Sequence, residues 1–216
     1  MRSLVQIQSS RPFKSTTMTR PWKVLLLTLL VPLVALAAWL AYHETRIPQN
    51  QFEVLNRMIE LQKEGRYDKA VQVVQTWMND SRRNISHDGF LYEQIAFGYI
   101  VKAYKKPATK DESVHQAELN LEKALGFFDK KKVEDIDIDL YGIGGAYEIL
   151  GDLSDKDKCR FYETAKQAFE RQLPMIKGDS YTAYGKTVPL EPVRGDIRKH
   201  LGGVSKKYSD AGCKVH

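Results

Sequence analysis

The chain has 216 residues, of which 43% are hydrophobic and 28% charged, as is typical of a globular domain with an apolar core. Its formal net charge is +6. Residues 1–23 hold five basic side chains and no acid, and the other 28 basic residues lie after position 42 with all 27 acidic ones. The part of the chain after position 42 is therefore nearly neutral. A nucleic-acid-binding domain needs a basic face, so this function loses most of its support and no nucleic-acid partner is expected.

An uncharged apolar run, VLLLTLLVPLVALAAWLAY, occupies residues 24–42. About 20 apolar residues in a helix are enough to cross the hydrocarbon core of a bilayer. Trp22, Trp39 and Tyr42 lie at its ends, where interfacial aromatic residues are common. The sequence thus predicts a transmembrane helix at residues 24–42, between a basic flank at 1–23 and a linker at 43–51.

The orientation and fate of this segment follow from its flanks. The positive flank predicts a cytoplasmic N-terminus, which places residues 43–216 in the periplasm of a bacterium with the helix in the inner membrane. An acid-free start rich in Arg, Ser and Thr also fits a mitochondrial presequence and the mitochondrial inner membrane, and Met18 is an alternative start. Ala35 and Ala37 fit a cleavable signal peptide, but the apolar run continues past them, which favours a retained anchor.

The rest of the chain predicts an all-α fold. Apolar residues at helical spacing indicate six helices over residues 52–173, near 54–64, 67–78, 88–104, 114–128, 140–150 and 161–173. In the first of them one face is predicted to consist of Leu55, Met58, Ile59 and Gln62, with Val54 and Leu61 flanking it. Residues 174–216 contain many Gly and Pro residues, so an irregular tail is expected, with a short capping helix around residues 197–208.

Three sets of residues in these helices resemble the tetratricopeptide repeat family. They are Gly65, Tyr67, Ala70, Val74 and Trp77; Ala117, Leu121 and Ala124; and Leu140, Ile143, Gly144 and Tyr147. Ala70, Ala117 and Ala165 are 47 and 48 residues apart, whereas the family's period is 34 residues. The resemblance implies three stacked helix pairs over residues 52–173, and an unrelated helical bundle is the alternative.

The resemblance also implies a concave groove, lined by the first helix of each pair, that binds a protein or peptide partner. The residues that would face this groove are Tyr92, Tyr99, Lys102, Tyr141 and Glu148. Tyrosine suits such a surface because it combines apolar area with a hydroxyl group. The alternative is that some of these tyrosines belong to the core.

No residue pattern in the chain indicates a catalytic site, a cofactor or a metal site, so an enzyme is not expected. Cys159 and Cys213, the only two cysteines, could form a disulfide in an oxidising compartment. The sequence therefore predicts a membrane-anchored protein-interaction module or scaffold on the non-cytoplasmic side. The alternatives are a secreted helical binding protein, released by signal cleavage, and an enzyme without a recognisable motif.

Overall fold

The computed structural model describes residues 30–39, 48, 50–80, 88–128, 139–183 and 186–214. The chain divides into two compact units, residues 1–46 and 47–216. In the first unit residues 30–39 form a helix whose apolar side chains, such as Leu33 and Trp39, are exposed. The basic flank at 1–23, and residues 24–29, 40–47 and 49, lie outside the described residues.

The prediction of a transmembrane helix at residues 24–42 is wrong for the part of the chain that is described. No helix there is long and apolar enough to cross a membrane. The predicted single-pass location, in a bacterial or a mitochondrial inner membrane, falls with it.

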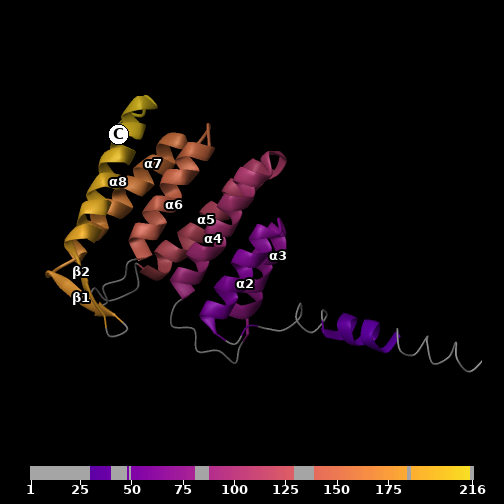
Figure 1. Ribbon diagram of the computed structural model, residues 1–216. Coiled ribbons are helices and arrows are strands. Elements are labelled where there is room, and N and C mark those ends of the chain that lie inside the picture. The colour runs from indigo at the N-terminus through magenta and orange to yellow at the C-terminus, as the bar shows by residue number, and fades with distance from the viewer. Residues whose placement is uncertain are drawn as a thin grey trace, which may run out of the picture. The chain divides into compact units, whose positions relative to one another are not determined.

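In the second unit the described residues form three successive helix pairs. These are α2 (Gln51–Lys63) with α3 (Tyr67–Met78), α4 (Asp88–Lys105) with α5 (Lys110–Phe128), and α6 (Asp139–Leu153) with α7 (Lys158–Gln172). A 3-10 helix, η1 (Pro107–Thr109), joins α4 to α5, and η2 (Leu173–Met175) follows α7. The pairs stack in chain order, because α3 packs on α4 and α5 packs on α6 (Figure 1).

The first pair shows how local sequence sets the helix ends. The Asn50 side chain caps α2 by accepting a hydrogen bond from the Glu53 amide at 2.9 Å. Gly65 has a φ of +74°, a left-handed conformation that glycine adopts without steric cost. The chain therefore reverses within a short turn, and α3 begins at Tyr67.

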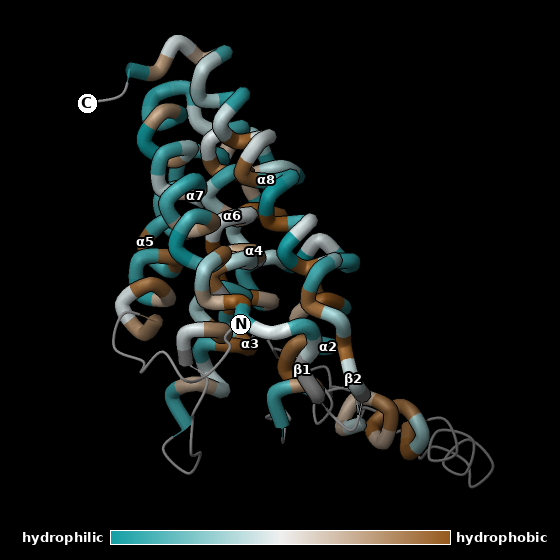
Figure 2. Tube along the Cα trace, turned by 90° about the vertical axis from the view of Figure 1, so that its left-hand side faces the viewer, coloured by the Kyte–Doolittle hydropathy of each residue, from teal (hydrophilic) through white to brown (hydrophobic). Residues whose placement is uncertain are grey.

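The predicted irregular tail has regular secondary structure over most of its length, and the short helix predicted around residues 197–208 lies within a longer one. Strands β1 (Ser180–Ala183) and β2 (Lys186–Pro189) form an antiparallel hairpin in which Tyr181 pairs with Val188. A long helix, α8 (Glu191–Asp210), then packs mainly against α7 and also touches α6. Apolar and polar residues alternate along α8 (Figure 2), and its Ile197 and Val204 are fully buried.

Two hydrophobic clusters form the core of this unit. One joins α2, α3 and the start of α4, with Val54, Val74 and Leu91 at 0% exposure. The other extends from α4 to α8, around Phe161 and Phe169. Tyr92 and Tyr99 of α4 pack against both clusters, so α4 connects the first helix pair to the rest of the stack.

Candidate functional site

The five residues predicted to line one groove fall into two sets with different partners. In α4, Lys102 forms an ion pair with Asp68 of α3, with Nζ and Oδ1 2.5 Å apart. The ring of Tyr92 stacks on Phe127 of α5, with the ring centroids 5.7 Å apart. These side chains therefore hold α4 against its neighbours α3 and α5.

Tyr99 lies in the same set. It is half-buried, and burial is the main reason that the pKa of its hydroxyl is raised. The nearby Lys102 lowers this pKa, and the carboxylates of Asp68 and Glu112 raise it. Tyr99 thus packs against both hydrophobic clusters while part of its side chain stays exposed.

The two predicted groove residues of α6 contact α8 instead. The Tyr141 hydroxyl donates a hydrogen bond to Oδ2 of Asp196 at 2.9 Å. Glu148 binds two groups of α8: its Oε1 lies 2.9 Å from Lys207 Nζ, and its Oε2 lies 3.1 Å from His200 Nδ1. Helix α8 therefore occupies the position in which a partner segment was expected at this end.

Polar contacts continue from Lys207 into α6 and α7. Lys207 also binds Oδ2 of Asp152 at 2.7 Å, and the Tyr162 hydroxyl donates to Oδ1 of Asp152 at 2.8 Å. We call this set the α6–α8 ladder. Its members are Tyr141, Glu148, Asp152, Tyr162, Asp196, His200 and Lys207.

Two pKa values in the ladder reflect these contacts. Burial, followed by the hydrogen bond to Asp152, raises the pKa of Tyr162 to about 12. Desolvation is the largest single influence on Lys207 and lowers its pKa, but hydrogen bonds and charges of Asp152 and Glu148 together raise it to about 12. The ladder thus stabilises a protonated lysine and a neutral phenol at the α6–α8 contact.

Glu148 and His200 have side chains of the types that form acid–base pairs, and His200 contacts two aromatic rings as well. Its imidazole stacks on Phe169, with centroids 5.7 Å apart, and meets the edge of Tyr141 at 5.5 Å. These contacts supply no aliphatic hydroxyl or thiol that His200 could activate, and Glu148 is shared with Lys207. The described residues also hold no cluster of ligands that suits a metal ion. We therefore interpret the ladder as the contact that fixes α8.

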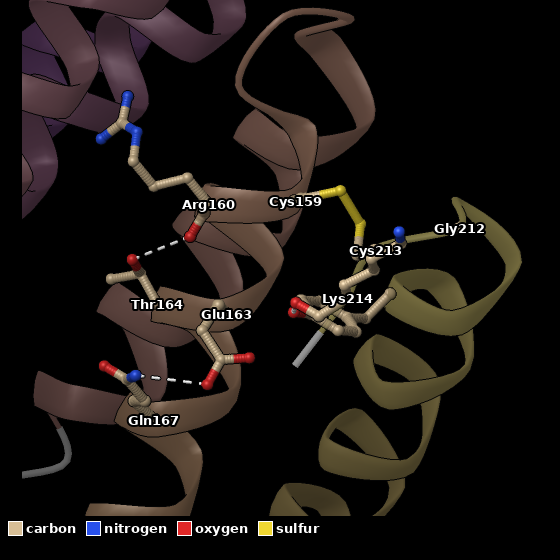
Figure 3. Close-up of a pocket in the computed structure, with 9 residues that line it drawn as sticks. Cys159, Arg160, Glu163, Thr164, Gln167, Gly212, Cys213 and Lys214 are labelled. Carbon is tan, nitrogen blue, oxygen red and sulfur yellow. Dashed lines mark hydrogen bonds between the residues drawn. A yellow bond between two sulfur atoms is a disulfide. The ribbon is translucent and has the colours of Figure 1, made fainter. Parts of the chain in front are cut away.

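A disulfide reinforces the same end of the stack. Cys159 at the start of α7 is joined to Cys213, which follows α8, and their Cα atoms are 5.5 Å apart. This is the pairing considered from the sequence. An open depression of about 770 Å³ lies beside the bond (Figure 3). Its lining includes both cysteines, Glu163, Gln167 and Lys214.

The opposite end of the stack carries an apolar face that the sequence did not reveal. Phe52 is 70% exposed and Ile59 is 47% exposed, with the half-buried Leu55 between them on α2. Residues seven apart share one face of a helix, so these side chains form a stripe, which we call the α2 stripe. The predicted buried face of α2 was therefore wrong in part, because the buried side chains are Val54, Met58 and Leu61.

Comparison with known proteins gives no family assignment: no protein-family model matches this chain, and neither curated proteins nor solved structures offer a significant match.

Proposed function

We propose that residues 47–216 form a non-catalytic, tetratricopeptide-like interaction module that binds an amphipathic helix of a protein partner on the α2 stripe. The observation that carries this proposal is the exposure of Phe52 and Ile59 at the end of a stack of helix pairs. A stack of this kind needs a polar or covered surface at each end, because every repeat buries its apolar face against a neighbour.

The two ends of the unit differ in how this need is met. At one end α8 covers α7 with buried Ile197 and Val204. At the other end, the main contacts of α2 are with α3 and α4, which bury its Val54 face and leave the α2 stripe exposed. Exposed apolar side chains that are grouped on one face are typical of an interaction surface.

The nature of the partner follows from the packing of the other helices. In this stack the amphipathic helix α3 packs on α4, and the amphipathic helix α7 packs on α8. An amphipathic helix on the α2 stripe would continue the same mode of packing. Phe52 and Ile59 are spaced to contact apolar side chains at positions i, i+3 and i+7 of such a helix.

A photo-crosslinking phenylalanine analogue at position 52 of the full chain would test the proposal. The captured protein is digested, the crosslinked segment is identified, and the segment is synthesised as a free peptide. We expect an amphipathic helical sequence whose affinity falls about tenfold or more when Phe52 and Ile59 are both replaced by Ser.

The matched control is Tyr104→Ser, because Tyr104 is 55% exposed on α4, away from the α2 stripe. This variant should bind the peptide as the unaltered chain does. The proposal is wrong if no crosslink forms at position 52, if the captured segment is polar throughout, or if Tyr104→Ser weakens binding as much as the Phe52/Ile59 change.

A further inference from the structure

We propose that the Cys159–Cys213 disulfide is a site of reversible exchange with small peptide thiols, and that the incoming thiol bonds to Cys213 while Cys159 leaves as a thiolate. This proposal does not rest on the proposed binding of a helix by α2. It rests on the access to the bond, on the different surroundings of the two sulfur atoms, and on the depression beside them.

The disulfide is accessible from solvent. Cys159 is exposed and Cys213 is half-buried, and both line the depression shown in Figure 3. Thiol–disulfide exchange requires a thiolate to approach one sulfur atom along the direction of the bond. A bond at the edge of an open depression permits that approach without unfolding of the helices around it.

Cys159 lies at the N-terminal end of α7, and Cys213 lies just after the C-terminal end of α8. Cys159 is the second residue of α7, and the helix has no side-chain hydrogen bond at its N-cap, Asp157. Cys213 follows the C-terminal end of α8, where its amide hydrogen bonds to the Tyr208 carbonyl at 3.2 Å. A helix N-terminus favours a negative charge and a C-terminus disfavours one, which favours a thiolate at Cys159 over one at Cys213. Lys214 beside Cys213 and Glu163 one turn after Cys159 act in the opposite sense, but both line the open depression, where solvent screens their charges.

The sulfur that leaves more readily as a thiolate, here Sγ of Cys159, determines that the other sulfur, Sγ of Cys213, is attacked. A thiolate RS⁻ attacks Sγ of Cys213, the S–S bond breaks, and its electron pair remains on Sγ of Cys159. The products are a mixed disulfide, Cys213–S–S–R, and the Cys159 thiolate. Because Cys159 stays within the folded chain, it attacks Cys213 in turn and expels RS⁻, which restores the original bond.

The lining of the depression suits a peptide thiol. Glu163, Gln167 and Lys214 line it, and Gln167 Nε2 donates a hydrogen bond to Glu163 Oε1 at 3.2 Å. The second carboxylate oxygen, the amide oxygen and the lysine ammonium match the amine, amide and carboxylate groups of a short peptide. Thr164 adds a hydroxyl whose hydrogen is donated to the Arg160 carbonyl. The Arg160 guanidinium is directed away from the sulfur atoms and pairs with Glu118.

Reduced glutathione added to the native, full-length chain tests the proposal. The reaction is quenched with acid, free thiols are blocked with N-ethylmaleimide, and the chain is cut after lysine. The peptides 159–166 and 208–214 then report the two cysteines separately. We expect glutathione on Cys213 and maleimide on Cys159, in about fivefold excess over the reverse pattern.

A control variant and a control thiol complete the experiment. Arg160→Gln should keep the same preference, because this guanidinium pairs with Glu118 rather than with the sulfur atoms. Mercaptoethanol, which lacks peptide groups, should react several-fold more slowly than glutathione at equal thiolate concentration. An equal or reversed distribution, equal rates for the two thiols, or adducts that form only under unfolding conditions would each overturn the proposal.

Discussion

The two ends of the helical stack differ in whether their terminal apolar surface is covered. Each terminal helix pair has an apolar surface that no further pair covers. At the C-terminal end this surface is covered by α8, which is fixed by buried Ile197 and Val204, by the α6–α8 ladder and by the disulfide. At the N-terminal end, α2 exposes Phe52 and Ile59. The C-terminal end is thus held by several interactions, whereas the N-terminal end leaves apolar side chains exposed.

The largest expected effect on stability comes from the disulfide. Replacement of both Cys159 and Cys213 by Ser removes a link between residues 54 positions apart. The expected loss is about 2–4 kcal/mol in the free energy of unfolding, measured by urea denaturation, because the unfolded chain regains conformational freedom. A loss below about 1 kcal/mol would mean that the ladder and the core alone fix α8.

A second test concerns the contact beneath the ladder. A Cβ added at Gly151 would lie 2.3 Å from the ring of Tyr162, the residue whose hydroxyl binds Asp152. Gly151→Ala should therefore destabilise the fold by about 1–3 kcal/mol, through displacement of that ring. Gly145 in the same helix has nothing within 4 Å of an added Cβ. The control Gly145→Ala should instead be neutral or stabilising by about 0.5–1 kcal/mol, and equal effects would contradict the packing described.

The ladder also predicts a dependence of stability on alkaline pH. The pKa of Lys207 is raised from 10.5 to about 12 in the folded chain, and that of Tyr162 from 10.0 to about 12. Each group therefore stabilises the fold fully below its unfolded pKa and loses this contribution as the pH rises through about 12. The ladder should weaken steadily above pH 10.

The variant Lys207→Met removes the pH-dependent contribution of Lys207 to the free energy of unfolding. At pH 8 it should cost about 1 kcal/mol, a small value because the Lys207 side chain is 38% exposed and solvent screens its charge. The deficit should shrink as the pH rises above 10.5, in chemical denaturation at matched ionic strength. Lys206→Met is the matched control, because Lys206 is an exposed neighbour on α8. A deficit that is constant with pH would contradict the ladder's role.

The smallest effect on the free energy of unfolding is expected for the α2 stripe. Phe52→Ser and Ile59→Ser remove exposed side chains, so each should change the free energy of unfolding by less than about 0.5 kcal/mol. Thermal unfolding of the free chain measures this. A loss of 2 kcal/mol or more, comparable to a buried leucine, would show that the α2 stripe is already covered in the free chain.

The sequence predicts the six helices of the pairs well, because their apolar residues recur at helical spacing. In the tail, two features were not predicted, for identifiable physical reasons. Gly195, Gly202 and Gly203 suggested breaks in the tail, yet they lie on α8 with nothing within 4 Å of an added Cβ, while Ile197 and Val204 pack inward. The hairpin was missed because strands of four residues carry too little alternation to be recognised.

The candidate site was less predictable than the fold. Tyr141 and Glu148 of α6 were predicted to line a partner-binding groove. No pattern in the sequence indicates that Asp196, His200 and Lys207 lie beside them, since these are about 50 residues away along the chain. The α2 stripe was missed because Leu55 and Ile59 were assigned to the buried face. A helix with apolar residues on more than half of its circumference does not reveal by periodicity which of them its neighbours cover.

Hydrogen–deuterium exchange on the free, full-length chain tests the difference between the two ends most directly. Backbone amides of α8 should exchange far more slowly than those of α2, since α8 is fixed by buried residues, the ladder and the disulfide. Reduction of the disulfide should accelerate exchange in α8 and leave α2 unchanged. Exchange in α2 that is as slow as in α8 would show a covered N-terminal end and contradict the account.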